Sequence, residues 1–474
     1  MKILILGAGT VGETVAYNLA HYSDYEITVI DKNEAALQKL ATRLDIQTVL
    51  GSVTSPSVLK EAGAEDTELL ISATGVDDTN LVACRMAKEI FNIPNLIARV
   101  RQSETVEYTF LQTKEGHAIT NSPLNLFDVT ESICPEQIVT EQLLQLLLTP
   151  GALQVVNFGE KLQDSSLRVQ MIVTRVEKNS PLVGHALGEL KTILLEPVEV
   201  KVCAIYRNEA LIIPTEKTRI ISGDEIYFIC LQEAVRILMG LFRPQEMGNK
   251  KIMIVGGGNI GYRLAKASET RFSTKIIEKN THRAEFLAEK LDEALVLQGS
   301  ANDEDLLQKE HISEVDMFFS LTNNNEDNIM SSLLAKKMGA KRVAAIINRS
   351  IYVGILVGNT IDIVISPHLA TIGSILSHIR KGDVVAVHPM RRGEAEALEV
   401  IVHGDEKTSK ITGRKSEEIS WPYGIDLVAI ISEGQLITST QHEIREGDHL
   451  IFFAFRKHAI RDLEKLLQVK WQFF

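Results

Sequence analysis

The stretch Met1-Lys-Ile-Leu-Ile-Leu-Gly-Ala-Gly-Thr-Val-Gly12 and its near-copy Lys251-Ile-Met-Ile-Val-Gly-Gly-Gly-Asn-Ile-Gly261 decide the fold of this 474-residue chain. Each is a short apolar run, typical of a buried parallel strand, followed by G-x-G-x-x-G and a helical pattern. In dinucleotide-binding folds the first glycine makes a tight turn, the second lets the backbone approach a phosphate, and the third lets the helix pack closely on the strand. The phosphates then lie at the helix N-terminus. One such hexapeptide is weak evidence, but two in the same context predict two nucleotide-binding folds.

An acidic residue ends the next strand expected in each half. Asp31 follows the third glycine of the first loop, Gly12, and Glu278 follows that of the second loop, Gly261. Both spacings are close to the roughly 20 residues expected for a carboxylate that accepts ribose hydroxyls, although such a residue can also merely cap a strand–helix connection. A carboxylate there repels a 2′-phosphate, which favours NAD or an adenine nucleotide over NADP. The pattern does not separate NAD(H) from ATP/ADP, because both carry an adenosine ribose and phosphates.

The order of strands and helices is repeated at a nearly constant offset in residue number. The offset is 248 for four pairs of landmarks, namely Gly51 and Gly299, Thr74 and Thr322, Asn80 and Asn328, and Arg101 and Arg349. The pairs Gly7 and Gly256, and Asp31 and Glu278, differ from this offset by a single position each. These landmarks predict an internal duplication. Because strands alternate with helices in each copy, we expect two parallel sheets.

A leucine-rich helix and a small β-rich lobe follow each nucleotide fold. The helices are expected at Pro135–Leu148 and Pro367–Ile379, and each packs either against a neighbouring lobe or subunit or inside its own core. The Gly-Asp turns at Gly223 and Gly447 lie closer together than the offset of the nucleotide folds, so the connection in the second half is shorter. The predicted fold class is α/β, with tandem Rossmann-like doubly wound parallel sheets that are each followed by a small α+β lobe. We place the domains at 1–125, 140–232, 249–366 and 384–469.

Composition excludes several classes of function. A formal net charge of −12 argues against general nucleic-acid binding, which needs a basic surface. No apolar run reaches the 18 or more residues of a membrane span, and the N-terminus begins with a strand instead of a signal peptide. The four cysteines form no C-x-x-C pair, and no His or carboxylate spacing indicates a metal, so we predict no metal site. The small lobes show no His/Asp or Lys constellation common to both halves, so we also predict no catalytic residues. These features indicate a cytoplasmic protein.

Further motifs resemble the regulator-of-potassium-conductance (RCK, or KTN) family of tandem nucleotide-binding regulators. The resemblance covers essentially the whole chain. It is carried by Val76-Asp-Asp-Thr-Asn-Leu-Val-Ala-Cys84, Phe91-Asn-Ile-Pro94, Ile97-Ala-Arg-Val-Arg101, Ser180-Pro-Leu-Val-Gly184 and Gly223-Asp-Glu-Ile-Tyr227.

The resemblance implies a non-enzymatic cytoplasmic subunit, peripheral on the inner face of the cell membrane, that binds NAD(H) or ATP/ADP. Such a subunit forms a ring, typically a homotetramer, beneath a membrane potassium transporter of the Trk type and gates it through ligand-dependent conformational change. By position, the first-half site would comprise Gly7, Ala8, Gly9, Thr10, Val11, Asp31, Thr74, Gly75 and Arg99. The second-half site would comprise Gly256, Gly257, Gly258, Asn259, Ile260, Glu278, Thr322, Asn323 and Arg349.

The chain departs from the family pattern in two places, and the roles of its arginines and its function each leave alternatives open. Many lobes of the family carry Gly-Asp after the third strand, whereas this chain has Gly51-Ser52 and Gly299-Ser300. At offset 248 Arg99 aligns with Ile347, so the halves do not use a strand-end guanidinium identically. Arg99, Arg101 and Arg349 either reach a phosphate or are exposed strand-end charges. The alternative functions are a tandem NAD-dependent oxidoreductase and a nucleotide-sensing scaffold for another partner.

Overall fold

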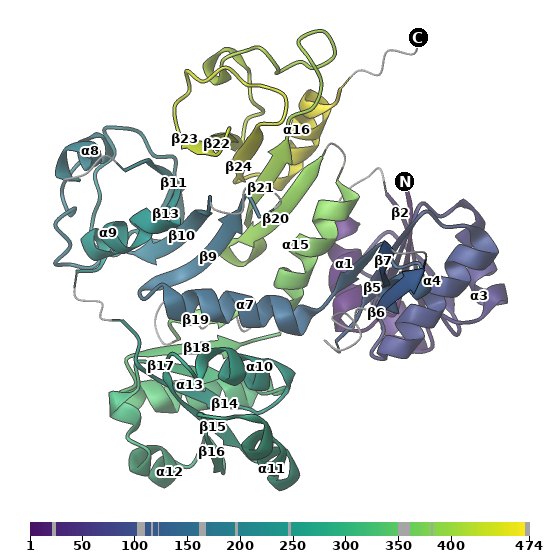
Figure 1. Cartoon of the computed structure of the whole chain (residues 1–474), viewed down its shortest axis with the longest axis horizontal. Helices are drawn as coiled ribbons and strands as arrows, with labels where there is room; N and C mark the ends of the chain where they lie inside the picture. The colour runs from purple at the N-terminus through teal and green to yellow at the C-terminus, as the bar shows by residue number, and fades with distance from the viewer. Residues whose placement is uncertain are drawn as a thin grey trace. The chain divides into compact units, whose positions relative to one another are not determined.

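The computed structural model describes residues 1–20, 25–101, 110–114, 117–121, 123–160, 167–194, 198–244, 248–348, 361–380 and 383–469 (Figure 1). Two compact units make up the chain. One comprises Met1–Ile138 with Pro367–Ile375, and the other comprises Val139–Ser366 with Leu376–Phe474. Among the helices of these described ranges, none has the length and apolar character needed to cross a membrane.

The first unit is built on a six-stranded parallel sheet in the order β3-β2-β1-β4-β5-β8. Its strands are β1 (Lys2–Leu6), β2 (Glu26–Asp31), β3 (Gln47–Leu50), β4 (Leu69–Ser72), β5 (Asn95–Arg99) and β8 (Glu131–Ile133). Its helices are α1 (Thr10–Leu19), α2 (Glu34–Ala41), α3 (Pro56–Glu61), α4 (Asp77–Phe91) and α6 (Pro123–Leu126). The strand order reverses between β1 and β4, which is where open α/β sheets bind ligands.

Helices cover both faces of this sheet, which explains why its strands are apolar throughout. Leu4 and Leu6 of β1 share a core with Cys84 of α4. Ile5 points the other way, and a Cβ on Gly12 of α1 would lie 3.5 Å from the Ile5 Cγ2 atom. Alternate residues of one strand are therefore buried under different helices.

The second half repeats this sheet with the order β16-β15-β14-β17-β18-β19, again parallel. Its strands are β14 (Lys251–Val255), β15 (Ser273–Glu278), β16 (Leu295–Gln298), β17 (Met317–Ser320), β18 (Arg342–Ile346) and β19 (Ile363–Ile365). Its helices are α10 (Asn259–Ser268), α11 (Thr281–Lys290), α12 (Glu304–Lys309) and α13 (Asn325–Lys337). The predicted duplication and fold class are thereby confirmed.

Two five-stranded antiparallel sheets form the small lobes, with orders β12-β11-β13-β10-β9 and β20-β21-β24-β22-β23. The strands of the first are β9 (Ala152–Phe158), β10 (Val169–Arg175), β11 (Val200–Arg207), β12 (Ala210–Ile212) and β13 (Glu225–Leu231). The strands of the second are β20 (Val384–Met390), β21 (Ala395–Ile401), β22 (Ile425–Ser432), β23 (Gln435–Ile437) and β24 (His449–Ala454). When one order is read from its opposite end, equivalent strands of the two lobes occupy the same places in their sheets. Helices α8 (Leu190–Ile193), α9 (Gln232–Phe242) and α16 (Ile460–Leu467) complete these lobes.

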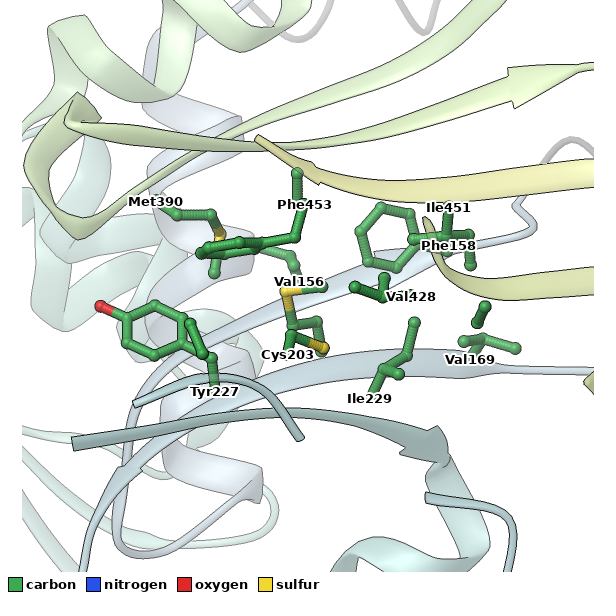
Figure 2. Packing of buried hydrophobic residues seen from close by; sticks show 14 of the residues in the cluster. Val156, Phe158, Val169, Cys203, Tyr227, Ile229, Met390, Val428, Ile451 and Phe453 are labelled. Atoms are coloured by element: carbon green, nitrogen blue, oxygen red, sulfur yellow. The ribbon is translucent and has the colours of Figure 1, made fainter. Parts of the chain in front are cut away.

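The two small lobes share one hydrophobic core within the second unit. Figure 2 shows Phe158 and Ile229 from the first sheet meeting Ile451 and Phe453 from the second. Tyr227 and Phe453 form an edge-to-face pair with ring centroids 5.6 Å apart. The lobes of the two halves therefore form one sandwich.

The shortening of the second half lies mainly before the small lobe. Strands β5 and β18 begin at Asn95 and Arg342, so they still keep nearly the offset of the glycine loops. Strands β8 and β19 begin at Glu131 and Ile363, which is a clearly smaller offset. In the first half this interval contains a hairpin of β6 (Phe110–Lys114) and β7 (His117–Asn121). A further, smaller reduction falls between the first two strands of the lobe.

The two leucine-rich helices have the predicted bounds, α7 (Pro135–Leu148) and α15 (Pro367–Ile379). In α7 the side chains of Val139, Leu143 and Leu147 are buried within this chain. The Leu147 carbonyl also accepts a hydrogen bond from Asn249 Nδ2 at 2.9 Å, so α7 packs against the start of the second half. The first part of α15, Pro367–Ile375, belongs to the first unit.

Candidate nucleotide-binding sites

Each glycine of the first loop has a distinct physical role. Gly7 adopts φ +104°, a conformation that other residues rarely take. A Cβ on Gly12 would lie 1.8 Å from the Gly7 carbonyl oxygen, so the close approach of α1 to the loop requires glycine there. A Cβ on Gly9 would meet no atom within 4 Å. Gly9 and Thr10 are exposed, and the surface over the middle glycine is therefore open.

The second loop repeats this geometry. Gly256 has φ +95°, and a Cβ on Gly261 would lie 1.9 Å from the Gly256 carbonyl oxygen. Gly258 again has open space where a Cβ would stand. Gly257, which occupies the place of Ala8, differs because a Cβ there would lie 2.2 Å from Leu287 Cδ1.

The two acidic residues contact their glycine loops through the backbone. Asp31 accepts hydrogen bonds from the Ala8 amide at 2.6 Å and from the Asn33 amide at 2.8 Å. Glu278 accepts from the Gly257 and Asn280 amides, both at 2.7 Å. Each carboxylate thus joins the loop to the start of the following helix, and its oxygens retain lone pairs for hydroxyl donors. Ribose binding by these residues stays a prediction that this placement favours.

A buried asparagine organises the end of the fourth strand in each half. Asn80 of α4 accepts from the Thr74 amide at 2.9 Å and from Thr74 Oγ1 at 2.6 Å, and its Nδ2 donates to the Arg99 carbonyl at 2.8 Å. Asn328 makes the same contacts with Thr322 and the Ile346 carbonyl. Sequence reasoning used these asparagines only as repeat landmarks. Both side chains are fully buried, and their hydrogen bonds connect two strand ends, a function that the sequence did not reveal.

The arginines after the fifth strand have partners in the protein. Arg99 Nη2 lies 3.5 Å from Glu136 Oε1, at the start of α7. The Arg101 amide donates to Asp77 Oδ2 at 2.8 Å, and its guanidinium contacts Asp77 and the Gly75 carbonyl. Both guanidinium groups are thus paired at the carboxyl edge of the sheet.

The predicted correspondence of Arg101 with Arg349 is wrong by one residue. The Arg101 amide donates to Asp77, and in the second half the Asn348 amide makes the same bond to Asn325 Oδ1 at 2.7 Å. The interval from the start of α13 to the start of β18 is one residue shorter than the interval from the start of α4 to the start of β5, so the offset between the two halves falls by one residue. Arg99 accordingly corresponds to Ile346 instead of Ile347. Arg349 itself lies outside the described residues.

His368 of α15 is a further member of the first-unit site. Neither of its ring nitrogens has a hydrogen-bond partner within the described residues. Burial, reinforced by the charge of Arg99 and opposed by Glu13 of α1, lowers the pKa of His368 to about 4. A neutral imidazole from the second half of the sequence therefore lies near Arg99.

The structure brings most of the predicted residues together at the carboxyl edges of the two parallel sheets. In the first half the glycine loop follows β1, Asp31 ends β2, Thr74 and Gly75 follow β4, and Arg99 ends β5. In the second half Asn259 and Ile260 open α10, while Thr322 and Asn323 follow β17. Within the described residues no cluster of three His, Cys, Asp or Glu side chains is arranged to hold a metal ion. Cys84, Cys203 and Cys230 are buried, and burial raises the pKa of the Cys84 and Cys230 thiols to about 12.

Two sheets of this order, each with a glycine loop at its reversal point and an acidic residue at the end of the adjacent strand, define a tandem protein of the Rossmann nucleotide-binding class. The chain is 43% identical over 475 residues to the Trk system potassium uptake protein TrkA of Halomonas elongata, with 100% of both chains covered. It belongs to the TrkA family.

Other comparisons agree with this assignment. TrkA of Vibrio alginolyticus is 41% identical over 469 residues, with 99% of each chain covered. The TrkA-N domain model matches residues 3–114 and 252–367, and the TrkA-C domain model matches residues 171–243. The crystal structure of the GsuK RCK domain has the same fold, with a TM-score of 0.61 and 16% identity over 98% of this chain and 94% of that chain. The GsuK channel bound to NAD also gives a TM-score of 0.61 at 16% identity, over 98% of this chain and 78% of that chain.

Proposed function

We propose that this chain is the nucleotide-binding regulatory subunit of a Trk-type potassium uptake system, and that it acts by conformational change instead of catalysis. The observation that carries the proposal is the pair of matching loops. In each, the middle glycine faces open space and the acidic residue holds the adjacent amide. These loops occur in a chain that is 43% identical over its full length to a protein named for potassium uptake.

The ligand proposed for these loops is NAD(H) or ATP/ADP. The amides at the start of α1 and α10 suit phosphates, and Asp31 and Glu278 suit a ribose diol. A structural neighbour with the same fold is described as bound to NAD, which supports this ligand class. In the first half, Arg99 would reach the far end of the ligand after exchanging its contact with Glu136.

Regulation in this proposal depends on differential affinity. A nucleotide shifts the balance between two conformations only if it binds one of them more tightly than the other. ATP and ADP, or NADH and NAD, would then favour different conformations of the subunit and change potassium flux through its membrane partner. We further propose a homotetramer at the inner face of the cell membrane.

The test is calorimetric titration of the purified chain with ATP, ADP, NAD and NADH, beside the Asp31→Ala and Glu278→Ala variants. We expect binding that weakens in one or both variants without turnover of the ligand. Nucleotide-dependent potassium flux in vesicles that contain a Trk-type transporter together with this chain would complete the test. Absence of binding by all four nucleotides would refute the function, and steady oxidation or reduction of the nicotinamide would favour an oxidoreductase instead.

A further inference from the structure

The second glycine loop carries an arginine contact. Arg283, in the first turn of α11, donates from Nε to the Gly257 carbonyl at 2.6 Å. Its guanidinium lies 4.5 Å from the ring centroid of Phe286 and 5.9 Å from that of Tyr262. These two rings are themselves an edge-to-face pair with centroids 5.9 Å apart. The carbonyl and the Phe286 ring together hold the guanidinium in place.

The first half has different groups at the same positions. Asn33 and Asn280 cap equivalent helices and accept hydrogen bonds from the Ala36 and Arg283 amides, so Ala36 corresponds to Arg283. The Glu13 and Tyr262 amides likewise make the same bond in α1 and α10, to the Gly9 and Gly258 carbonyls.

An ion pair in the first half replaces the aromatic pair of the second. Lys39, which corresponds to Phe286, donates to Glu13 Oε1 at 2.7 Å. The first loop thus adjoins an ammonium–carboxylate pair, whereas the second adjoins a planar cation resting on an aromatic ring.

The position of Arg283 relative to the acidic residue indicates which part of a ligand it meets. Gly257 donates its amide to Glu278 Oε2 at 2.7 Å and accepts from Arg283 through its carbonyl. The guanidinium and the ribose-side carboxylate therefore flank one residue. The terminal nitrogens of Arg283 make no hydrogen bond or ion pair within the described part of the chain.

We propose that the second nucleotide site recognises a purine base by stacking it on the guanidinium of Arg283, and that the first site lacks this contact. The guanidinium carbon lies over the Phe286 ring, and a base beyond the ribose would stack on the side of the guanidinium that is turned away from this ring. Guanidinium groups stack on planar rings, which an ammonium group does not do. The neighbouring Glu278 carboxylate disfavours a 2′-phosphate as the partner of this arginine. This inference rests on the proposed function and makes the two sites unequal.

The experiment measures ADP and UDP binding to the full chain in a Gly9→Val background, which leaves the second site alone. We expect Arg283→Lys and Arg283→Ala to weaken ADP binding about tenfold, the loss typical of one base-stacking contact. UDP binding should weaken less than ADP binding, because a pyrimidine offers a smaller stacking surface than a purine. As a matched gain of function, Ala36→Arg with Lys39→Phe in a Gly258→Val background should raise the preference of the first site for ADP over UDP.

The outcomes separate this inference from the function on which it rests. Equal loss of ADP and UDP affinity in Arg283→Lys would mean that Arg283 only clamps the loop, and would overturn the stacking role. Affinity kept in Arg283→Lys but lost in Arg283→Ala would mean that Arg283 only neutralises phosphate, and would overturn it too. Tighter binding of NADP than of NAD that disappears in Arg283→Ala would also overturn it, in favour of 2′-phosphate recognition. If no nucleotide binds to the unmodified chain, both the function and the inference fail.

Discussion

Gly9 and Gly12 belong to the same glycine motif, but substitution of Gly9 should affect nucleotide binding whereas substitution of Gly12 should affect stability. A Cβ on Gly12 would stand 1.8 Å from the Gly7 carbonyl oxygen, whereas a Cβ on Gly9 would meet no atom within 4 Å. We expect Gly9→Val to keep the melting temperature within a few degrees while abolishing nucleotide binding at the first site. Gly12→Ala should lower the free energy of unfolding by roughly 3 kcal/mol, because backbone must move. Thermal melts and calorimetry of both variants test this contrast.

The same pair of substitutions is available in the second loop as a control. Gly258 and Gly261 have the same surroundings as Gly9 and Gly12, with 1.9 Å from a Gly261 Cβ to the Gly256 oxygen. If Gly9→Val and Gly258→Val both leave nucleotide binding intact at their own sites in a folded protein, the loops do not hold phosphates.

His368 should make the free energy of unfolding depend on pH. Its pKa is lowered to about 4, so the imidazole stays neutral in the folded chain while it is protonated in the unfolded chain below about pH 6.5. Stability that is present above pH 6.5 is therefore lost as the pH falls from 6.5 towards 4, by up to about 3 kcal/mol. We expect His368→Phe to flatten this part of the profile in urea melts.

The control for His368 is an exposed histidine. His282 is 96% exposed, and His282→Phe should leave the profile of the unmodified chain. A His368→Phe profile that runs parallel to the unmodified one between pH 4 and 6.5 would contradict the assignment of this pH dependence to His368.

At the scale of elements, Asn80 connects α4 to the ends of β4 and β5. Replacing Asn80 with alanine leaves the Thr74 amide and the Arg99 carbonyl without their side-chain partner. Unsatisfied buried groups of this kind cost about 1–3 kcal/mol each, so we expect Asn80→Ala to lower the free energy of unfolding by about 2–4 kcal/mol. Urea unfolding measures this loss. Val82→Ala, on the exposed face of the same helix, is the matched control and should change stability by less than about 0.5 kcal/mol.

Some helices and strands could be predicted from the sequence, whereas others could not. The bounds of α7 and α15 were predicted as observed, because apolar periodicity and a proline at the helix start mark them clearly. Strand β20 was missed, since it contains Pro389 and lies at a sheet edge, where proline is tolerated but weakens the pattern. Strand β9, at the opposite sheet's edge, was missed as well.

Only some residues of the candidate sites could be predicted from the sequence. The glycine loops and Asp31 follow from local spacing, which a sequence displays directly. Asn80 and His368 do not. The sequence does not show that Asn80 turns inward to bond the ends of β4 and β5, and His368 comes near Arg99 from the other half of the sequence. The single-residue shift that separates Arg101 from Arg349 was also hidden, because the offset changes within a helix connection whose ends carry similar residues.

At the scale of the whole molecule, the two halves of the sequence depend on each other for their cores. Within the second unit, Met171 and Ile229 of the first lobe share a core with Ile451 and Phe453 of the second. Polar contacts reinforce this core. The Gly159 amide donates to Glu399 Oε2 at 3.1 Å, Gln154 Nε2 donates to the Pro389 carbonyl at 2.9 Å, and Lys201 Nζ donates to the Leu427 carbonyl at 2.7 Å.

This mutual dependence predicts that residues 1–248 and 249–474, produced as separate chains in one cell, will associate. Each half alone would expose the apolar face of a five-stranded sheet, and such faces drive association in water. The first part of α15, Pro367–Ile375, also belongs to the unit formed by the N-terminal half, which adds a second contact between the chains. Affinity purification through a tag on one half should recover both in equal amounts. Phe453→Asp, which places a charge in the shared core, should sharply reduce the recovery, whereas Glu433→Lys on an exposed turn should not. Recovery of two separately folded monomers, each with a cooperative melt, would show that the lobes do not need one another.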